Sequence, residues 1–544
     1  MCAIFACICD QKEKAIERLQ KIEPFLRRRG PDCSRIITVE IEDCHKEYTL
    51  VLFASVLHLR GDKISEQPFE DEFGNLLLWN GEIFTGFDEL QLHSNDTVLL
   101  SQKLSSCKLD FEIVNCFSRI RGPHSFVYWQ KSAKKLWFGR DFFGRRSLCW
   151  NKDEHSHIFT VASVVGFSDD CDQWCEIPTS GIYSIDFKTD FNFNPSLFKW
   201  TSLVTNDRET NDLCVPAPIN TPLNTNITNT ETADHISESD AVVEQFLSVL
   251  NEAVRIRVQL QNNVCSNCVK VKELANSCNH SVVAVLFSGG LDSTLLAFLA
   301  NTHIPENIPI DLINVAFDEK AADRLTAISA LSELKNLCPR RQWNFVKVDV
   351  PLEKLRKKRD SRIKYLIHPL NTVLDDSIGC ALWFAARGKG LLNEHRYTSP
   401  ARIVLLGMGA DEQLAGYTRH RRVYDTHGLC GLLSEIELEL QRISTRNLGR
   451  DDRIVSDSGR EARYPFLDET VVNYLNSLPV YKKCNLDKPR GFGEKLLLRY
   501  AAKKLGFTTL CEHHKRAIQF GTGIAKLENR SEKANNVCNR LKLC

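Results

Sequence analysis

A short run near the middle of the chain has the composition of a phosphate-binding loop. Ser288-Gly-Gly-Leu-Asp-Ser-Thr294 combines two adjacent glycines, three hydroxyl side chains and one carboxylate. Glycines let the backbone approach a ligand closely, and the free N–H groups at a helix start favour an anion. No Gly-Lys-Ser/Thr follows, so this is not a Walker loop. A tight strand-to-helix turn is the alternative, but the complete heptapeptide favours a nucleotide-phosphate site.

Cys2 is the second residue with a specific chemical possibility, because only Met1 precedes it. Removal of Met1, which a small second residue permits, would leave a cysteine with both a thiol and a free α-amine. An α-amine has a pKa of about 8 and can take the thiol proton, so one residue can supply both nucleophile and base. Cys2 alone carries no such meaning, and the residues that follow it must supply the rest of the pattern.

Strand and helix patterns alternate around the Ser288–Thr294 loop. The sequence predicts strands at residues 282–287, 311–317, 344–348 and 403–407, and helices at 291–300 and 323–336. This alternation is typical of an α/β domain with a parallel sheet. Gly407-Met-Gly-Ala-Asp-Glu412 follows one of these strands, so Asp411 and Glu412 are expected at the carboxyl edge of the sheet, where open α/β sheets bind ligands.

The first 200 residues have a different pattern. Short apolar runs, for example at residues 49–57, 76–79, 125–129 and 135–138, are separated by Gly, Pro and Asn, and residues 10–28 are amphipathic. This predicts a β-rich α+β domain with few helices. Residues 201–240 are rich in Thr, Asn, Ser, Asp and Pro and cannot bury enough apolar area to fold, so they are expected to form a linker. The expected organisation is therefore a domain over residues 2–200, a polar linker over 201–240 and a second domain over 241–544.

The bulk composition restricts the class of function. The 544 residues are 43% hydrophobic and 26% charged, with a net charge of +1. Such a charge creates no field that would recruit nucleic acid or an anionic membrane. No apolar run approaches the roughly 18 residues of a membrane helix, and the start of the chain lacks a signal peptide pattern. We expect a cytoplasmic protein that acts on small molecules, with neither nucleic acid nor membrane as a partner.

Cysteine is unusually frequent, with 21 residues. Without a secretion signal, most are expected to be reduced thiols in the core. Cys265-Ser-Asn-Cys268, followed by Cys278 and His280, has the residue types of a zinc site. The second pair lacks the spacing of a zinc finger or ribbon, so the pattern favours a tolerated surface insertion over a metal site.

Two ordered sets of motifs resemble the glutamine-hydrolysing asparagine synthetase family. The first set spans about residues 2–187: Cys2, Arg29-Gly-Pro-Asp32, Gln67-Pro68, Asn80-Gly-Glu-Ile-Phe84, Asp96 and Gly139-Arg-Asp-Phe-Phe-Gly144. The second spans about 241–526: Ser288–Thr294, Gly407–Glu412, Arg446-Asn-Leu-Gly-Arg-Asp-Asp-Arg453 and Gly459-Arg-Glu-Ala-Arg-Tyr-Pro-Phe-Leu-Asp468. The last strings resemble the asparagine synthetase domain-containing branch. The resemblance implies a class II amidotransferase domain of the N-terminal-nucleophile type, with layered β-sheets and helices, and an α/β domain of the ATP-pyrophosphatase type.

For the second domain the resemblance implies ATP and Mg²⁺. Asp292 and Asp411 would be the magnesium–pyrophosphate carboxylates, and oxygen ligands suit this ion. Glu461 and Arg463 would form a buried pair that braces the site. The implied nucleotide-binding residues are Leu286, Ser288, Gly289, Gly290, Asp292, Ser293, Val315, Gly407 and Lys515, with Arg516 as the alternative to Lys515.

For the first domain the resemblance implies glutamine hydrolysis. Cys2 would attack the side-chain amide, while Asn80 and the backbone N–H of Gly81 would stabilise the oxyanion. Glu82 and Asp96 would hold the α-amino group of glutamine, and Arg60 its α-carboxylate. Arg60 is displaced by several residues from the family's arginine, and Ala3 stands where the family has glycine.

The implied reaction uses glutamine, ATP and an aspartate-like acid and yields an amide, AMP and pyrophosphate; a homodimer is possible. Met408 replaces a glutamate of the family loop, and Leu406 replaces a serine. These changes leave open another acceptor acid, or slow ammonia transfer with Glu461 as a substitute base. A binding or regulatory protein without activity is a third alternative. The presence of Cys2, Asn80, Asp292 and Asp411 argues against it.

Overall fold

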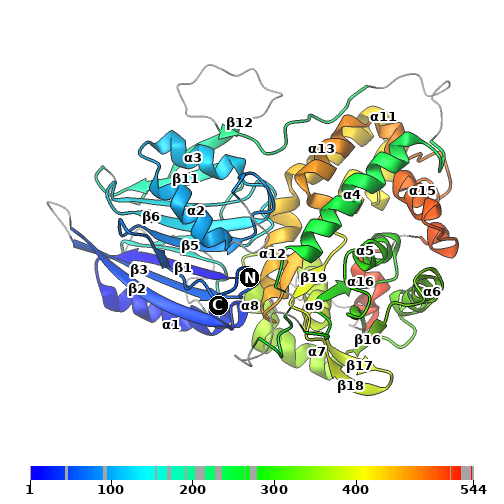
Figure 1. Cartoon of the computed structure of the whole chain (residues 1–544), viewed down its shortest axis with the longest axis horizontal. Coiled ribbons are helices and arrows are strands. Elements are labelled where there is room, and N and C mark those ends of the chain that lie inside the picture. The colour runs from blue at the N-terminus through cyan, green and yellow to red at the C-terminus, as the bar shows by residue number, and fades with distance from the viewer. Residues whose placement is uncertain are drawn as a thin grey trace.

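The computed structural model describes residues 2–42, 47–89, 95–153, 156–167, 173–189, 193–201, 215–226, 236–262, 264–269, 278–514, 516–527 and 541. The chain forms two halves side by side, one built mainly of strands and one in which helices surround a smaller sheet (Figure 1). No described helix is long and apolar enough to span a membrane. Of the expected linker, residues 202–214 and 227–235 lie outside the described residues, and a short strand within it joins the first half.

The first half contains two stacked sheets. One is antiparallel, in the order β10 (Cys175–Glu176), β8 (Cys149–Asp153), β9 (Ile158–Ala162), β1 (Ala3–Cys9), β3 (Glu47–Val56) and β2 (Cys33–Glu42). The other has the order β13 (Val215–Pro216), β12 (Ser196–Thr201), β11 (Gly181–Asp186), β7 (Lys135–Arg140), β6 (His124–Gln130), β5 (Leu76–Gly81) and β4 (Phe69–Glu70).

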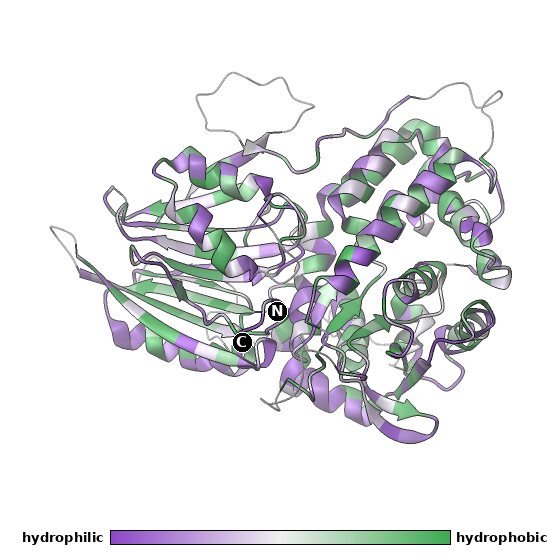
Figure 2. Ribbon diagram, viewed as in Figure 1, coloured by the Kyte–Doolittle hydropathy of each residue, from purple (hydrophilic) through white to green (hydrophobic). Residues whose placement is uncertain are grey.

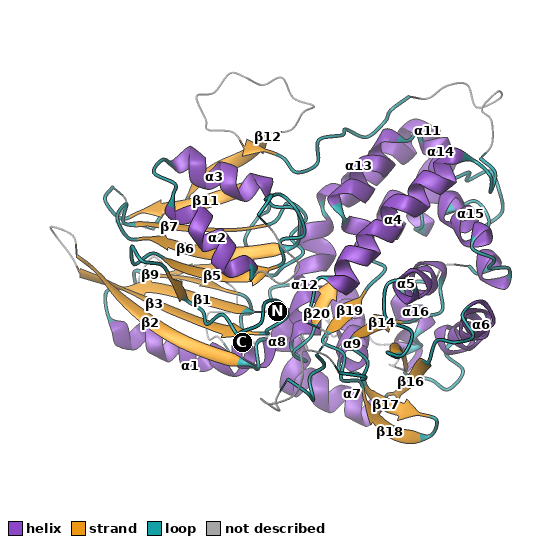
Figure 3. Cartoon of the chain, in the orientation of Figure 1, coloured by secondary structure: helices purple, strands orange, loops and turns teal. Residues whose placement is uncertain are grey.

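Helices cover the outer faces of both sheets, which gives four layers (Figure 3). Helix α1 (Lys12–Arg29) packs on the first sheet, and α2 (Asp96–Ser105) and α3 (Asp110–Arg119) lie on the second. Strand β1 lies between a helix and the second sheet. Its odd-numbered residues Ala3, Phe5, Cys7 and Cys9 face α1, while Ile4, Ala6 and Ile8 face the second sheet. A strand buried on both faces is therefore apolar throughout, as this strand is.

The second half is built on a sheet in the order β18 (His395–Thr398), β17 (Lys389–Leu392), β16 (Trp343–Asp349), β15 (Ile310–Ala316), β14 (Val283–Leu286), β19 (Ile403–Leu405) and β20 (Glu461–Arg463). Strands β16, β15, β14, β19 and β20 are parallel to one another. Strands β17 and β18 add an antiparallel hairpin. The strand order reverses between β14 and β19. Loops leaving the carboxyl ends of these two strands diverge, and this is the position where open parallel sheets bind ligands.

Helices surround this sheet on both faces (Figures 1 and 3). Apolar residues are concentrated along the strands and the inward sides of the helices (Figure 2). The main helices are α4 (Ala241–Gln259), α5 (Leu291–Asn301), α6 (Ala322–Leu337), α9 (Val373–Ala386), α11 (Thr418–Gln441, kinked at Gly428), α12 (Gly449–Ser456), α13 (Glu469–Ser477) and α15 (Leu496–Lys504). Shorter helices include α7 (Leu352–Lys358), α8 (Lys364–Ile367), α10 (Ala410–Gln413), α14 (Val480–Lys483), α16 (Ile518–Gly521) and α17 (Ile524–Leu527).

Buried ion pairs join the two halves. Arg29 donates to Asp452 at 2.8 Å, Arg145 to Glu469 at 2.5 Å, and Arg453 to Glu176 at 2.6 Å. Each of these six side chains is at most 7% exposed. Asp452 and Arg453 of α12 are thus part of the contact between the halves, while Arg450 of the same helix pairs with Asp375 and Asp451 within the second half.

Candidate active sites

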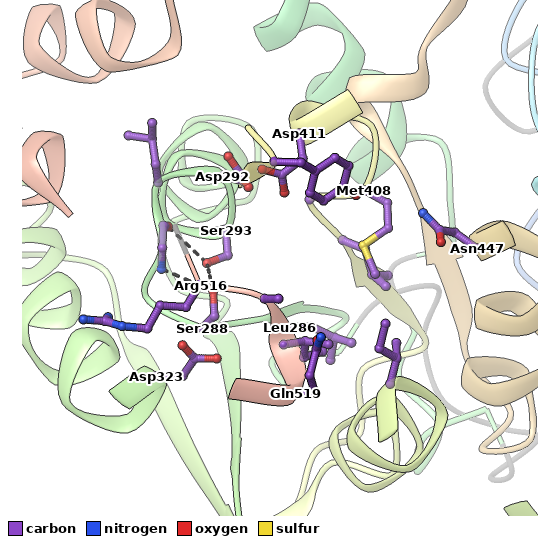
Figure 4. A pocket seen from close by; sticks show the side chains of 18 of the residues that line it. Leu286, Ser288, Asp292, Ser293, Asp323, Met408, Asp411, Asn447, Arg516 and Gln519 are labelled. Carbon is purple, nitrogen blue, oxygen red and sulfur yellow. Dashed lines mark hydrogen bonds between the residues drawn. The ribbon is translucent and has the colours of Figure 1, made fainter. Parts of the chain in front are cut away.

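A cavity of about 330 Å³ opens at the carboxyl ends of β14 and β19. This volume lies within the range of small-molecule pockets. The cavity brings together residues that are far apart in the sequence, with the Ser288–Thr294 loop on one side and the 406–412 loop on the other (Figure 4). The predicted nucleotide residues that line it are Leu286, Ser288, Gly290, Asp292, Ser293, Gly407 and Asp411.

The loop after β14 is held in shape by its own hydroxyls. Ser288 Oγ accepts from the Gly290 backbone N–H at 3.2 Å and lies 3.3 Å from Ser293 Oγ. Gly289 has φ +74°, and a Cβ there would lie 2.3 Å from the backbone of Ala327 in α6. Gly289 is therefore required for close packing of the loop on α6, and it is Gly290 that lines the cavity. Val315 is buried in β15 and is not among the lining residues.

Two carboxylates contact the same ammonium group beside the Ser288–Thr294 loop. Lys495 Nζ lies 2.6 Å from Asp292 Oδ2 and 2.8 Å from Asp411 Oδ1. Burial alone would lower the pKa of Lys495, but Asp292 and Asp411 outweigh it and raise the pKa above the usual value. Lys495 is thus a buried, permanently charged group. It holds together the two residues that the sequence predicts as metal ligands.

Sequence reasoning missed Lys495 and chose Lys515, which lies outside the described residues. The alternative, Arg516, does line the cavity and donates to Thr326 Oγ1 at 3.3 Å. Lys495 precedes α15 in a left-handed backbone conformation, with φ 53°. Its neighbours in the sequence give no phosphate-loop pattern, and the only available signal was a lysine between Gly493-Glu494 and an apolar helix.

The loop after β19 is fixed by Glu412. Its carboxylate accepts from the Gly409 backbone N–H at 3.0 Å, from Tyr417 Oη at 2.6 Å and from Asn447 Nδ2 at 3.2 Å. Burial, followed by the charge of Asp411, raises the pKa of Glu412. Glu412 is thus a positioning residue that orients the loop carrying Asp411.

One wall of the cavity is apolar. Met408 lines it together with Leu374, Ile378, Leu382 and Leu406, and Figure 4 shows Met408 on the same side of the cavity as Asn447. Glu461 is not among the lining residues. The expectation that Glu461 could replace the missing glutamate is therefore wrong, because its carboxylate is occupied elsewhere by Arg463 at 2.6 Å and Arg146 at 3.0 Å.

The predicted glutaminase residues gather where β1 begins. Gln67 Nε2 lies 3.7 Å from Cys2 Sγ, and Gln67 Oε1 accepts from the Trp79 backbone N–H at 2.7 Å. Burial is the main reason that the pKa of the Cys2 thiol is raised to about 11. A thiol with its pKa raised in this way needs a base close by to become a nucleophile.

Asn80 and Gly81 end β5 and pair with Ser125 and His124 of β6. Asn80 is fully buried, and its Nδ2 lies 3.4 Å from Ser125 Oγ. A Cβ at Gly81 would lie 2.6–2.8 Å from His124, Pro123 and Trp79, so only glycine allows this close approach. Asn80 Oδ1 has no hydrogen-bond partner among the described residues.

Glu82, Asp96 and Arg60 are brought together beside this strand end. Arg60 Nη1 lies 3.7 Å from Glu82 Oε2 and donates to the carbonyl of Ile83 at 2.7 Å. Asp96 accepts from the Trp79 indole at 3.3 Å and from the Ile83 backbone N–H at 3.2 Å. Burial is the first cause that raises the pKa of Glu82, to about 8, and the charge of Glu461 adds to it.

The second half reaches into this group of residues. Arg463 of β20 lies 3.4 Å from Glu82 and also donates to Glu461, so the predicted Glu461–Arg463 pair is confirmed. Burial would raise the pKa of Glu461, yet Arg463 and Arg146 outweigh it and lower the pKa to about 2. The Glu461–Arg463 pair therefore lies beside the predicted glutaminase residues, whereas the sequence predicted it at the nucleotide site.

Comparison with known proteins identifies the family. A family model described as a glutamine amidotransferase domain matches residues 1–185, and one described as asparagine synthase matches residues 424–539. Asparagine synthetase domain-containing protein 1 of Homo sapiens is 42% identical, over 95% of this chain and 94% of the relative. The chain belongs to the family of asparagine synthetase domain-containing proteins. A Gallus gallus member is 41% identical over 98% of both chains, and one of Drosophila melanogaster is 34% identical over 99% of this chain and all of the relative.

Membership of this family assigns a domain type to each half of the chain. The four-layer first half is a glutamine amidotransferase domain of the N-terminal-nucleophile fold, and the second is an ATP-using asparagine synthase domain. Such a pair of domains supports glutamine-dependent amidation. The predicted family and fold are therefore confirmed, while the acceptor and the roles of individual residues belong to the proposal below.

Proposed function

We propose that this protein is a glutamine-dependent amidoligase that activates a carboxylic acid with ATP. The observation that carries the proposal is the buried Lys495 ammonium between Asp292 and Asp411, directly beside the glycine loop. A cradle of N–H groups, hydroxyls and one buried cation next to paired carboxylates suits a triphosphate and its metal ion better than it suits a neutral ligand.

In the first half, Cys2 is the proposed nucleophile. Once Met1 is removed, the α-amine of Cys2 takes the thiol proton, and the thiolate attacks the side-chain carbonyl carbon of glutamine. Asn80 Nδ2 and the Gly81 N–H stabilise the oxyanion, and ammonia leaves. Water then hydrolyses the thioester to glutamate. Glu82 and Asp96 are the proposed partners of the substrate α-ammonium, and Arg60 is that of its carboxylate.

In the second half, the acceptor carboxylate attacks the α-phosphorus of ATP. An acyl-adenylate forms and pyrophosphate leaves; ammonia from the first half then displaces AMP to give the amide. Ser288, Gly290 and Ser293 are the proposed pyrophosphate donors. The oxygen atoms of Asp292 and Asp411 fit Mg²⁺, which when bound would neutralise phosphate charge. Lys495 supplies a fixed positive charge where negative charge develops on the leaving pyrophosphate.

The proposed acceptor is an aspartate-like acid that lies against an apolar wall. Met408 and Leu406 offer no proton acceptor for the attacking ammonia, and Glu461 is directed away from the cavity by its two arginines. Adenylation therefore has its proposed residues, whereas the apolar wall supplies no base for proton removal in the second step. Because the apolar wall lacks a base, we expect asparagine to form slowly, or a second acid with an apolar side chain to be the better acceptor.

The proposal is tested by incubating the full chain with glutamine, ATP, Mg²⁺ and aspartate. We expect glutamate, AMP and pyrophosphate, with asparagine formed more slowly than pyrophosphate is released. Other small carboxylic acids replace aspartate in parallel reactions. Release of ADP and phosphate, or no ATP cleavage with any acid, would contradict the proposed reaction.

The variant Met408→Glu restores a proton acceptor on the apolar wall. It is expected to raise the rate of asparagine formation by about 10²-fold, the lower end of general-base contributions. Met408→Gln is the matched control, because it is polar and of similar size but cannot take a proton. A wild type already as fast as its own adenylation step, with no gain in Met408→Glu, would show that this position does not limit the reaction.

A further inference from the structure

A cluster of four potential metal ligands shares no residue with either proposed active site. Cys265, Cys268, Cys278 and His280 come together between the end of α4 and the start of β14, with their ligand atoms all within 4.8 Å of one another. The sequence spacing favours a surface insertion for this segment. The structure differs from this expectation, because the fold brings Cys265 and Cys268 together with Cys278 and His280.

The distances match those expected around a single tetrahedral ion. His280 Nδ1 lies 3.7 Å from Cys265 Sγ and 3.4 Å from Cys268 Sγ. Zinc–sulfur and zinc–nitrogen bonds of usual length place neighbouring ligands about 3.6–3.8 Å apart. A separation below 4.8 Å for every pair leaves room for one ion and is too small for a multi-iron cluster.

Hydrogen bonding does not explain the arrangement equally well. Two thiols approach the same imidazole nitrogen, and that nitrogen carries either one lone pair or one proton, so it can form a normal hydrogen bond with only one of them. The backbone N–H of Cys265 points to Cys278 Sγ at 3.4 Å. An N–H directed at a sulfur is the kind of outer contact that supports a metal-bound thiolate. All the described cysteines are free, so no disulfide accounts for the cluster within the part of the chain that the structure describes.

We propose that Cys265, Cys268, Cys278 and His280 bind one Zn²⁺ ion as a closed structural site. Three thiolates and one imidazole complete a tetrahedron and leave no position for water or substrate, so the ion has a structural role. Cys265 is fully buried in the hydrophobic core shared by α4 and β14, while His280 is exposed at the surface. The ion would thus fasten a surface segment to the core.

The position of the cluster indicates which segments a bound ion would hold in place. Directly before it, the backbone N–H of Asn262 donates to the Leu59 carbonyl at 2.7 Å, and the Leu260 carbonyl accepts from Arg463 at 3.2 Å. Directly after it, β14 leads into the Ser288 loop. Zinc would therefore fix the segment that contacts the amidotransferase domain on one side and enters the nucleotide loop on the other.

The test measures metal in the full chain, purified without a metal-affinity step or chelator. Elemental mass spectrometry is expected to find about one zinc ion per chain, and Cys268→Ser and His280→Ala are expected to lose most of it. Cys430→Ser is the matched control, because Cys430 is an exposed cysteine on α11. Zinc that is absent from the wild type and not taken up by it, or retained equally in all variants, would overturn the proposal.

Cobalt substitution of the wild type keeps the test decisive if the variants fail to fold. Co²⁺ in a three-thiolate tetrahedral site is expected to give thiolate charge-transfer bands and strong visible absorption, which added zinc abolishes. A mercurial reagent that modifies the three cluster thiols should release the metal. Weak visible bands typical of six oxygen ligands, or a Cys265–Cys268 disulfide found by mass spectrometry of the native protein, would exclude the proposed site.

Discussion

Replacement of Lys495 by methionine is expected to lower ATP-dependent pyrophosphate release by a factor of about 10²–10³, the usual effect of removing one group that stabilises developing charge. Lys495 is buried between Asp292 and Asp411, so no solvent cation can take its place at the same distance. The rate of pyrophosphate release with the acceptor acid measures the effect. Asp292→Asn should give a loss of similar size, since it removes the other half of the same contact.

Lys503→Met is the matched control, because it changes a lysine of α15, the helix that Lys495 directly precedes, and the Lys503 side chain is 44% exposed. The glutamine hydrolysis rate of Lys495→Met should stay near that of the wild type, which separates loss of charge at the nucleotide site from loss of the whole fold. Unchanged pyrophosphate release in both Lys495→Met and Asp292→Asn would mean that the nucleotide binds elsewhere.

Replacement of Cys2 by alanine should lower glutamine-dependent amide formation by about 10³-fold or more, the order of loss seen when a catalytic nucleophile is removed. Amide formation from added ammonium salt should remain, because the proposed nucleotide residues belong to the other half. The ratio of the glutamine-dependent to the ammonia-dependent rate measures the effect. Cys175→Ala, at an exposed cysteine of the same domain, should change neither rate.

The same assignment fixes the start of the mature chain. The intact mass of the native protein should correspond to Cys2 as the first residue, and a glutamine-like diazoketone should label Cys2 but not the exposed Cys175. Persistence of Met1 on fully active protein would rule out the α-amine of Cys2 as the base.

Local patterns in the sequence predicted much of the fold. The strands predicted at 282–287 and 403–407 appear as β14 and β19, and the helix predicted at 291–300 appears as α5, with boundaries shifted by one or two residues. These elements combine apolar runs with turn residues at their ends, and neither property depends on distant parts of the chain. The nucleotide loop was predictable for the same reason, because strand, glycines and helix are contiguous.

Contacts between distant segments could not be predicted in this way. Lys495 meets Asp292 across about 200 residues, and Arg463 approaches Glu82 from the other half. Only the folded chain shows that Cys278 and His280 return to Cys265 and Cys268. In each case the sequence supplied the residue type, while the pairing depended on how whole elements pack.

The ion pairs between the halves have a consequence for how the molecule unfolds. Arg29–Asp452, Arg145–Glu469 and Arg453–Glu176 are each shared by both halves and shielded from water. Removing one partner of such a pair costs about 3–5 kcal/mol, because the other charge is left buried and uncompensated. That is comparable with the entire net stability of many domains, about 5–15 kcal/mol. Since one hydrophobic cluster also runs through both halves, we expect the chain to melt as one cooperative unit, and a gene truncated to either half to encode a protein prone to aggregate.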